Sequence, residues 1–207
     1  MNQRYKKQQI LSFQSEVPRY LYQITDGYVR LYSITDAGNE RTLDIFGPGD
    51  MFPLTWALGL SPVSLYNYET FTNVDLIAYR PSELSAVLAD AHELIHKQMA
   101  RNEVTSLMKI NALSQDTARD VVLRLLHYLV LRFGDHTQLR NWQKIVIPLT
   151  QQDIANMTSL ARETVAVILK DLKDQKIITV RQKYYSLDME SVVKRIEATD
   201  FEVNLEV

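Results

Sequence analysis

The stretch "LTQQDIANMTSLARETVAVILKDLKDQKII", residues 149–178, contains two short helical patterns separated by a polar break. In the second, about 161–175, apolar residues recur three and four positions apart, which predicts a helix with one buried stripe. The stripe consists of Val165, Ile168, Leu169 and Leu172. A predicted hairpin, "KIITVRQKYYSLD" (176–188), follows directly. Two helices and a hairpin in this order predict a winged helix-turn-helix.

The outer face of the second helix carries side chains suited to reading DNA bases. Arginine offers paired donors to guanine, glutamate accepts from the cytosine amino group, and an apolar side chain contacts the thymine methyl. Arg162, Glu163 and Val167 supply these three types. The start of the preceding helix suits phosphate contacts, aided by the positive end of the helix dipole. The residues expected at DNA are Arg162, Glu163, Thr164, Val167, Lys170, Thr150, Gln151, Gln152 and, in the wing, Lys183. The alternative is that Arg162 and Glu163 are merely solvated at a helix end.

Composition limits the remaining possibilities. The chain has 207 residues, 46% hydrophobic and 23% charged, which suits two soluble modules. It has no cysteine, which excludes disulfides, thiolate nucleophiles, iron–sulfur clusters and cysteine-bound zinc. The first ten residues, "MNQRYKKQQI", are polar and basic, unlike a secretory signal, and no apolar run reaches membrane-spanning length. We expect a cytoplasmic protein without a membrane partner.

Charge is distributed unevenly along the chain. The net charge is −2, yet residues 114–187 contain 11 basic and 7 acidic side chains. This excess permits an anionic partner, although an ordinary solvated surface also accounts for it.

The first half of the chain has the pattern of strands and turns. Five of the six glycines precede residue 60, and "LYQITDG" (21–27) is echoed by "LYSITDAG" (31–38). Further strands are predicted at 41–46, 65–72 and 74–80, with "GPGD" (47–50) as a turn. The spacing predicts a small antiparallel β-roll.

A long helix is predicted next, over about 82–113, without glycine or proline. Its length favours pairing with a second copy, although its apolar residues do not form a clean heptad. A second apolar helix is predicted at 115–133, then a polar loop and a short strand at 145–148. The predicted fold class is α+β, with residues 1–113 forming the β-roll and dimerisation helix and 114–207 the winged helix-turn-helix.

The chain resembles the CRP/FNR family of bacterial transcription regulators. The family's cyclic-AMP receptor protein has Ser-Arg-Glu-Thr-Val in its recognition helix, followed by Ile-Leu and Leu-x-x-Gln-x-x-Ile. The matching residues here are Arg162, Glu163, Thr164, Val165, Ile168, Leu169, Leu172, Gln175 and Ile178. The stretch "LYQITDGYVRLYSITDAGNERTLDIFGPGDMF" (21–52) is similar to the family's β-roll. The resemblance implies a homodimer on double-stranded DNA, contact with RNA polymerase, and rotation of the C-terminal modules about residues 113–116.

Departures from the family pattern bear on the half-site and on the effector. Val167 and Gln151 stand where the cyclic-AMP receptor protein has arginines, which implies a different half-site, and Ser159 replaces the turn glycine. A serine there costs little only if its φ is negative. Residues 49–72 contain no arginine or lysine, so a buried cyclic phosphate would lack its counter-charge. We therefore expect an effector other than cyclic AMP, or none.

Aromatic residues of the roll and two residues of the long helix are candidates for a different effector pocket. Its candidate residues are Trp56, Tyr66, Tyr68, Thr105 and Ser106, the last two within "VTS" (104–106), which resembles the stretch that meets adenine in the cyclic-AMP receptor protein. The alternative is that the aromatic residues belong to the roll core.

The motif "HELIH" (92–96) fits the zinc-protease pattern, in which two histidines bind the metal. A catalytic site also needs a third ligand, and the other histidines, His127 and His136, lie in a different predicted module. We expect an exposed helix face, no metal and no cofactor. The function predicted is a DNA-binding transcription regulator and not an enzyme. The alternatives are a metal-dependent hydrolase using HELIH, and a ligand- or partner-binding roll with a vestigial DNA module.

Overall fold

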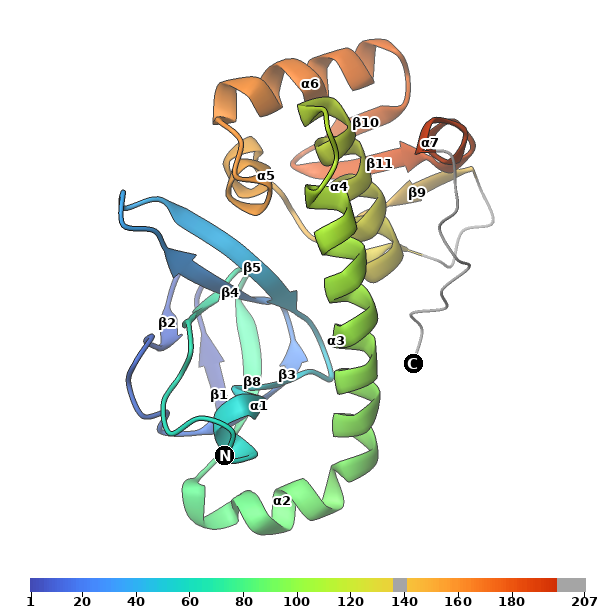
Figure 1. Cartoon of the computed structure of the whole chain (residues 1–207). Helices are drawn as coiled ribbons and strands as arrows, with labels where there is room; N and C mark the ends of the chain where they lie inside the picture. Colours follow the sequence, from blue (N-terminus) through green and yellow to red (C-terminus); the bar gives the residue numbers. More distant parts are fainter. Residues whose placement is uncertain (136–140, 197–207) are drawn as a thin grey trace. The chain divides into compact units, whose positions relative to one another are not determined.

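The structure is a computed structural model that describes residues 1–135 and 141–196. The chain divides into two compact units, Met1–Met99 and Ala100–Val207, and each is described by itself. Figure 1 shows the strands of the first unit in blue to green and the helices and wing of the second in yellow-green to red. Among the described residues, no helix has both the length and the hydropathy needed to span a bilayer.

The first unit is the predicted antiparallel β-roll, built from two four-stranded sheets. One sheet has the order β1-β8-β3-β6 and the other β2-β7-β4-β5. The strands are β1 (Asn2–Tyr5), β2 (Ile10–Ser12), β3 (Leu21–Asp26), β4 (Val29–Ile34), β5 (Glu40–Phe46), β6 (Met51–Phe52), β7 (Asn67–Thr70) and β8 (Val74–Tyr79). The sequence did not reveal β1 and β2.

Aromatic side chains fill the core between the two sheets. The Phe52 ring is 0% exposed and stacks on Tyr68, with 4.9 Å between ring centroids. Tyr22 also stacks on Phe52, with 5.4 Å between ring centroids. Offset aromatic pairs of this kind add to the free energy already gained by burying the rings.

Gly27 forms the predicted turn between β3 and β4. Its φ is +83°, and a Cβ at this position would lie 2.2 Å from the carbonyl oxygen of Asn73. Both the backbone conformation and the close approach of the segment at Asn73 therefore require glycine.

The long helix predicted over about 82–113 is interrupted, so that expectation was wrong. A 3₁₀ turn, η1 (Pro81–Glu83), leads into α2 (Leu84–Asp90), which ends at Ala91 with φ −95° and ψ 13°. A separate helix, α3 (His92–Leu113), follows and contains the boundary between the two units. Leu84 and Leu88 pack against a cluster around Leu21 and Met51, and this packing on the roll is compatible with the change of direction at Ala91. A four-residue helix, α1 (Leu54–Ala57), also contributes to that cluster.

The second unit contains the predicted winged helix-turn-helix. Its helices are α4 (Ala118–Phe133), α5 (Gln151–Thr158), α6 (Arg162–Asp174) and α7 (Met189–Ile196). A three-stranded sheet in the order β10-β11-β9 consists of β9 (Trp142–Lys144), β10 (Ile178–Arg181) and β11 (Tyr184–Asp188). The strand expected at 145–148 ends earlier, with Ile145 forming only an isolated bridge to Gly134. The sequence did not reveal α7.

Candidate nucleic-acid interface

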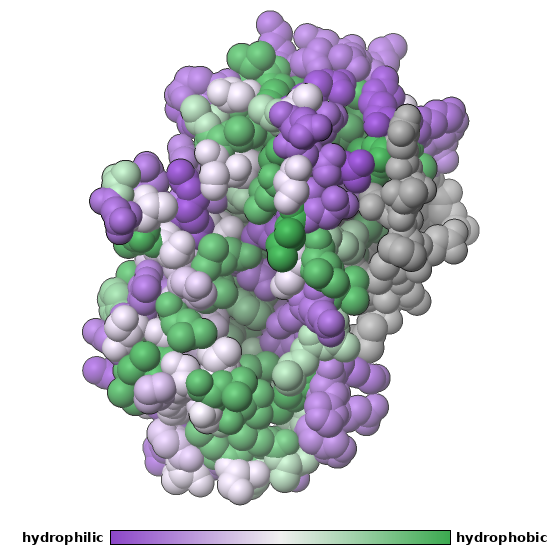
Figure 2. Space-filling view, in the orientation of Figure 1, coloured by the Kyte–Doolittle hydropathy of each residue, from purple (hydrophilic) through white to green (hydrophobic). Residues whose placement is uncertain are grey.

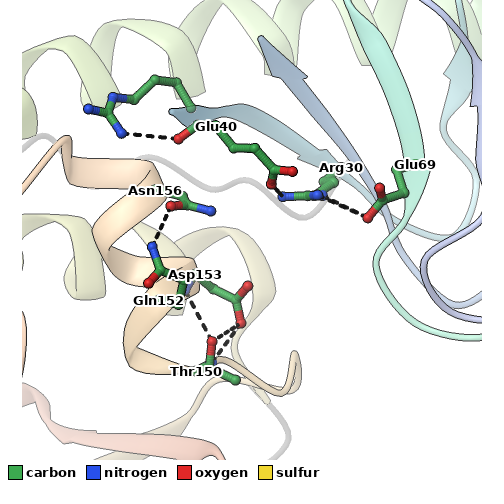
Figure 3. A network of polar contacts seen from close by, with 8 residues as sticks. Arg30, Glu40, Glu69, Thr150, Gln152, Asp153 and Asn156 are labelled. Atoms are coloured by element: carbon green, nitrogen blue, oxygen red, sulfur yellow. Dashed lines mark hydrogen bonds and ion pairs between the residues drawn. The ribbon is translucent and has the colours of Figure 1, made fainter. Parts of the chain in front are cut away.

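The start of α5 is held by a reciprocal cap between Thr150 and Asp153. The Thr150 hydroxyl accepts the Asp153 N–H at 3.1 Å, and the Asp153 carboxylate accepts the Thr150 N–H at 2.7 Å. The same carboxylate accepts the Thr150 hydroxyl proton at 2.7 Å, as Figure 3 shows. The cap occupies the Thr150 side chain. The neighbouring side chains of Gln151 and Gln152 are therefore better placed to contact phosphate. Gln152 is exposed, and its amide donates to Asn156 at 2.8 Å.

The turn between α5 and α6 is left-handed at Ser159, where φ is +61° and ψ is 14°. Serine would cost little at this position only if its φ were negative, and that condition is not met. A residue other than glycine in this conformation crowds its Cβ against the following carbonyl. Ser159 thus holds this turn at some cost in conformational free energy.

The helix α6 buries the predicted stripe and exposes the predicted outer face. Val165 and Leu172 are 0% exposed, whereas Val167 is 69% exposed. Arg162, Glu163, Thr164 and Lys170 are exposed with it. Figure 2 shows hydrophilic residues predominating over the region of α6, with apolar residues between them. The predicted placement of this face is confirmed, while the contacts of each side chain with DNA remain a prediction.

A bridge to α4 holds the C-terminal half of α6. Arg119 of α4 donates from Nε to the Asp171 carboxylate at 3.1 Å and from a terminal nitrogen to the Gln175 side chain at 3.0 Å. The hydrogen bond from Arg119, followed by one from Gln175, lowers the pKa of Asp171 below its ordinary value. The buried stripe and this polar bridge together hold α6 in place, and they thereby fix the orientation of its outer face.

The wing turns through two left-handed residues, Gln182 and Lys183, with φ of 49° and 71°. Two consecutive positive φ values are typical of the tight hairpin turn that matches strand twist. The Lys183 carbonyl accepts the Leu149 N–H at 2.8 Å, which ties the wing tip to the segment before α5. The Lys183 side chain is exposed, as is that of Arg181. Arg181, which lies beside the wing turn in the sequence, was not among the residues predicted to contact DNA.

Comparisons with known proteins bear on both units. Residues 2–91 match the model of the cyclic nucleotide-binding domain, and residues 123–194 match the model of the Crp-like helix-turn-helix domain. The chain belongs to the CRP/FNR family of transcription regulators. It is accordingly a DNA-binding regulator of the CRP/FNR type, as the sequence predicted.

The CRP/FNR relatives match over most of their length. The transcriptional regulator LdrP of Thermus thermophilus is 25% identical over 90% of this chain and 92% of its own. The CRP-like cAMP-activated global transcriptional regulator of Mycobacterium tuberculosis is 29% identical over 84% of this chain and 79% of its own. Among solved structures, a CRP-family regulator from Thermus thermophilus superposes with a TM-score of 0.76 at 22% identity, covering 95% of this chain and 97% of its own. FixK2 from Bradyrhizobium japonicum gives 0.75 at 21% identity, over 94% and 96%.

The residues considered for an effector pocket have varied environments. Tyr68 is 7% exposed within the stacked core, and burial raises the pKa of its hydroxyl. Trp56 is half-buried beside the cluster around Leu21, and Tyr66 is 38% exposed. In the second unit, Thr105 donates to the Asn102 carbonyl at 3.2 Å, and Ser106 is exposed. The aromatic ring of Tyr68 therefore has a structural role, as the alternative reading of the sequence allowed.

The HELIH motif lies in the first turns of α3. His92 and His96 are both exposed, with 6.2 Å between ring centroids, and the His92 ring nitrogen Nδ1 contacts the Ala89 carbonyl at 2.9 Å. Within residues 1–135 and 141–196, no cluster of three histidine, aspartate or glutamate side chains is arranged to bind a metal. His127 is buried on α4, and His136 lies outside the described residues.

Proposed function

We propose that this CRP/FNR regulator reads its operator with the outer face of α6 and positions itself with the start of α5 and the wing. The observation that carries the proposal is the 69% exposure of Val167 beside Glu163 and Lys170 on one helix face, which Arg162 flanks near the N-terminus of the helix. An exposed β-branched residue flanked by charges gains little in water but fits a thymine methyl beside a guanine. Phosphate contacts from Gln151, Gln152 and Lys183 would set the register of the helix.

The proposed assembly is a homodimer that joins through α3. Two recognition helices then reach half-sites about 34 Å apart, one helical turn of DNA. The functional boundary is proposed at residues 113–114, with 113–116 as the hinge through which a signal changes the orientation of the DNA-binding module. The signal must favour the binding-competent arrangement energetically, because equal affinity for both arrangements shifts nothing. The setting is the cytoplasm of a bacterium, with RNA polymerase as the expected partner of the DNA-bound dimer.

The proposed effector is a compound other than cyclic AMP, and a protein that needs no effector is the alternative. The segment 49–72 contains no arginine or lysine to balance a buried phosphate. Cyclic AMP at millimolar concentration should therefore leave the melting temperature unchanged, since only a ligand that binds the folded state raises it. A clear rise would contradict this proposal without touching the DNA-binding one.

Selection from a random duplex pool tests the readout. The full-length protein should enrich a two-fold symmetric site, and Arg162→Ala should enrich a site that has lost one guanine. Lys173→Ala is the matched control, because Lys173 is also an exposed cation of α6 but lies in its last turn. Equal enrichment of all sequences by the unaltered protein would overturn the proposal and favour a vestigial DNA module.

A further inference from the structure

A hollow lies in the β-roll, lined by residues outside the segment 49–72. It is a cavity of about 320 Å³ lined by residues of β1, β2 and β3 and by the segment 13–20. Its lining includes three tyrosines, one serine, one arginine and one glutamate: Tyr5, Tyr20, Tyr22, Ser12, Arg19 and Glu16. All of them belong to the first unit.

The Ser12 hydroxyl has no hydrogen-bond partner in the described part of the chain. Ser12 is 7% exposed, lines the cavity, and follows a bulge in the pairing of β2 with β7. A buried hydroxyl without a partner costs about 1 to 3 kcal/mol. Such a group in a native protein calls for an explanation, and a ligand atom that completes its hydrogen bond provides one.

The tyrosines form aromatic walls with polar edges. The rings of Tyr20 and Tyr22 lie 5.8 Å apart, tilted by 57°, and Tyr5 packs against the same core. Burial, followed by the neighbouring Tyr5, raises the pKa of Tyr22 above its ordinary value. The Tyr22 phenol therefore remains neutral near pH 7, while the Tyr5 hydroxyl donates to the Gln3 side chain. Exposed Phe13 and Val17 add an apolar rim.

One cation and one carboxylate define the electrostatics of the cavity. Arg19 is exposed and forms no ion pair within residues 1–135 and 141–196, so its guanidinium is available for bidentate binding of a carboxylate. Glu16 is exposed in the same lining. Its carboxylate repels a second negative charge, which disfavours dianions such as phosphate esters.

We propose that this cavity binds a small aromatic monocarboxylate. Arg19 binds the carboxylate, the tyrosine rings enclose the aromatic group, and the Ser12 hydroxyl donates to a ligand oxygen. Glu16 excludes dianions. The lining residues of the site lie outside the segment 49–72. The existence of the site does not depend on how the protein recognises DNA.

Three hydrogen bonds connect the cavity wall to the segment that follows α1. Ser15 donates its N–H to the Ser64 carbonyl at 2.8 Å, and Ser64 donates its N–H to the Glu16 carbonyl at 2.9 Å. Gln14 donates its N–H to the Asn67 side chain at 3.0 Å. A ligand that orders this wall should therefore slow amide hydrogen exchange at Ser15 and Ser64.

Isothermal titration of the full-length protein with 3-phenylpropionate tests the site. We expect saturable binding, at least tenfold weaker for the neutral analogue 3-phenylpropionamide, because the amide lacks the charge that Arg19 recognises. Arg19→Gln should weaken binding of the carboxylate about tenfold or more. Arg80→Gln, which alters an exposed arginine outside the cavity, should bind as the unaltered protein does. Protection of Ser15 and Ser64 should accompany binding.

Ser12→Ala separates a ligand-binding role from a structural one. Removing an unpartnered buried hydroxyl should leave the melting temperature of the free protein unchanged or higher, while affinity for 3-phenylpropionate falls several-fold. Absence of saturable binding, equal affinity for the acid and the amide, or unchanged binding by Arg19→Gln would each overturn the proposal. A lower melting temperature for Ser12→Ala together with unchanged affinity would show that the hydroxyl is structural and would also count against it.

Discussion

The side chain of Gln98 in α3 pairs with both backbone polar groups of Met51 in β6. The Met51 N–H donates to Gln98 Oε1 at 2.8 Å, and Gln98 Nε2 donates to the Met51 carbonyl at 2.9 Å. Gln98 is 1% exposed, and so is Met51. The side-chain amide thus makes the two hydrogen bonds that a neighbouring strand would make to Met51 at the edge of β6. It also anchors the start of α3 to the roll.

Gln98→Leu should destabilise the protein by about 2 kcal/mol or more, because both Met51 groups remain buried without partners. Leucine has nearly the volume of glutamine, so the loss arises mainly from hydrogen bonding. Urea unfolding measures the change. Lys97→Leu, at the exposed neighbouring position, should alter the free energy of unfolding by less than about 0.5 kcal/mol. Equal stability of the two variants would show that Met51 finds other partners.

Ser159→Gly should stabilise the second unit by about 0.5 to 1 kcal/mol. Relief of the left-handed conformation at φ +61° outweighs the extra entropy that glycine gives the unfolded chain. Ser159→Val should have the opposite effect, since a β-branched residue tolerates this conformation poorly. Thermal unfolding measured in parallel on the three proteins gives the order. A glycine variant less stable than the parent would contradict the assignment of strain.

The Arg30 guanidinium in β4 contacts two carboxylates, as Figure 3 shows, at 2.7 Å to Glu40 and 3.0 Å to Glu69. Arg30 and Glu69 side chains are only 11% and 12% exposed. Arg30→Met should therefore destabilise the roll by about 3 to 5 kcal/mol, because Glu69 keeps a buried charge without its partner. Arg30→Met with Glu69→Gln should recover part of the loss in chemical unfolding. A double variant no more stable than the single one would show that packing of Arg30, and not its charge, dominates.

Asp171 should make a small contribution to stability that disappears in acid. Its pKa is lowered in the folded protein by the hydrogen bonds from Arg119 and Gln175. A lowered pKa contributes stability above the unfolded value of 3.8, and this contribution is lost as pH falls through the folded value. The melting temperature of the parent should therefore fall more steeply than that of Asp171→Asn between about pH 5 and pH 2. Equal slopes for the two proteins would show that ionisation of Asp171 contributes nothing to the stability of the folded protein.

The recognition helix was predictable because its signal is local. Four apolar residues at helical spacing define its buried stripe, and the opposite face follows from geometry alone. The turn at Gly27 was predictable for the same reason, since the Asp-Gly pair acts within a few residues of the chain. In these places local preference and tertiary structure agree.

Other features depend on distant partners and left little trace in the sequence. The interruption at Ala91 accompanies packing of α2 on Leu21 and Met51, and neither glycine nor proline marks it. Strand β1 exposes most of its polar residues and exists through its pairing with β8, about seventy positions away. The pairing of Gln98 with Met51 and the unpartnered hydroxyl of Ser12 likewise appear only in three dimensions.

Arg162→Ala should weaken binding to the selected operator by about 1 to 3 kcal/mol and relax preference at one base pair. Gel-shift titration against the operator and its single-base variants measures both effects. The unaltered protein should also lose affinity with salt, with a log–log slope of about −0.9 per phosphate contact. Lys173→Ala should retain the base preference. Retained preference in Arg162→Ala would remove this residue from the readers.

An exposed apolar stripe on α3 identifies the surface through which the proposed dimer forms. Ile110 and Leu113 are 61% and 39% exposed, and at about 100° per residue they lie about 60° apart around the helix. Leu107 flanks them at 62%. A stripe of this kind exposed along a helix is typical of a helix–helix interface, because its burial removes apolar surface from water.

Ile110→Glu should therefore convert the dimer into a monomer without unfolding it, since the position is exposed within one chain. Facing glutamates in a symmetric interface repel each other and lose the apolar contact. Sedimentation velocity measures the association state, and far-UV circular dichroism should be unchanged. Lys97→Glu, at an exposed position about 140° from Ile110 around the same helix, should remain dimeric. Operator affinity should fall sharply in Ile110→Glu, because each monomer contacts only one half-site, and a variant that stays dimeric would exclude this stripe as the interface.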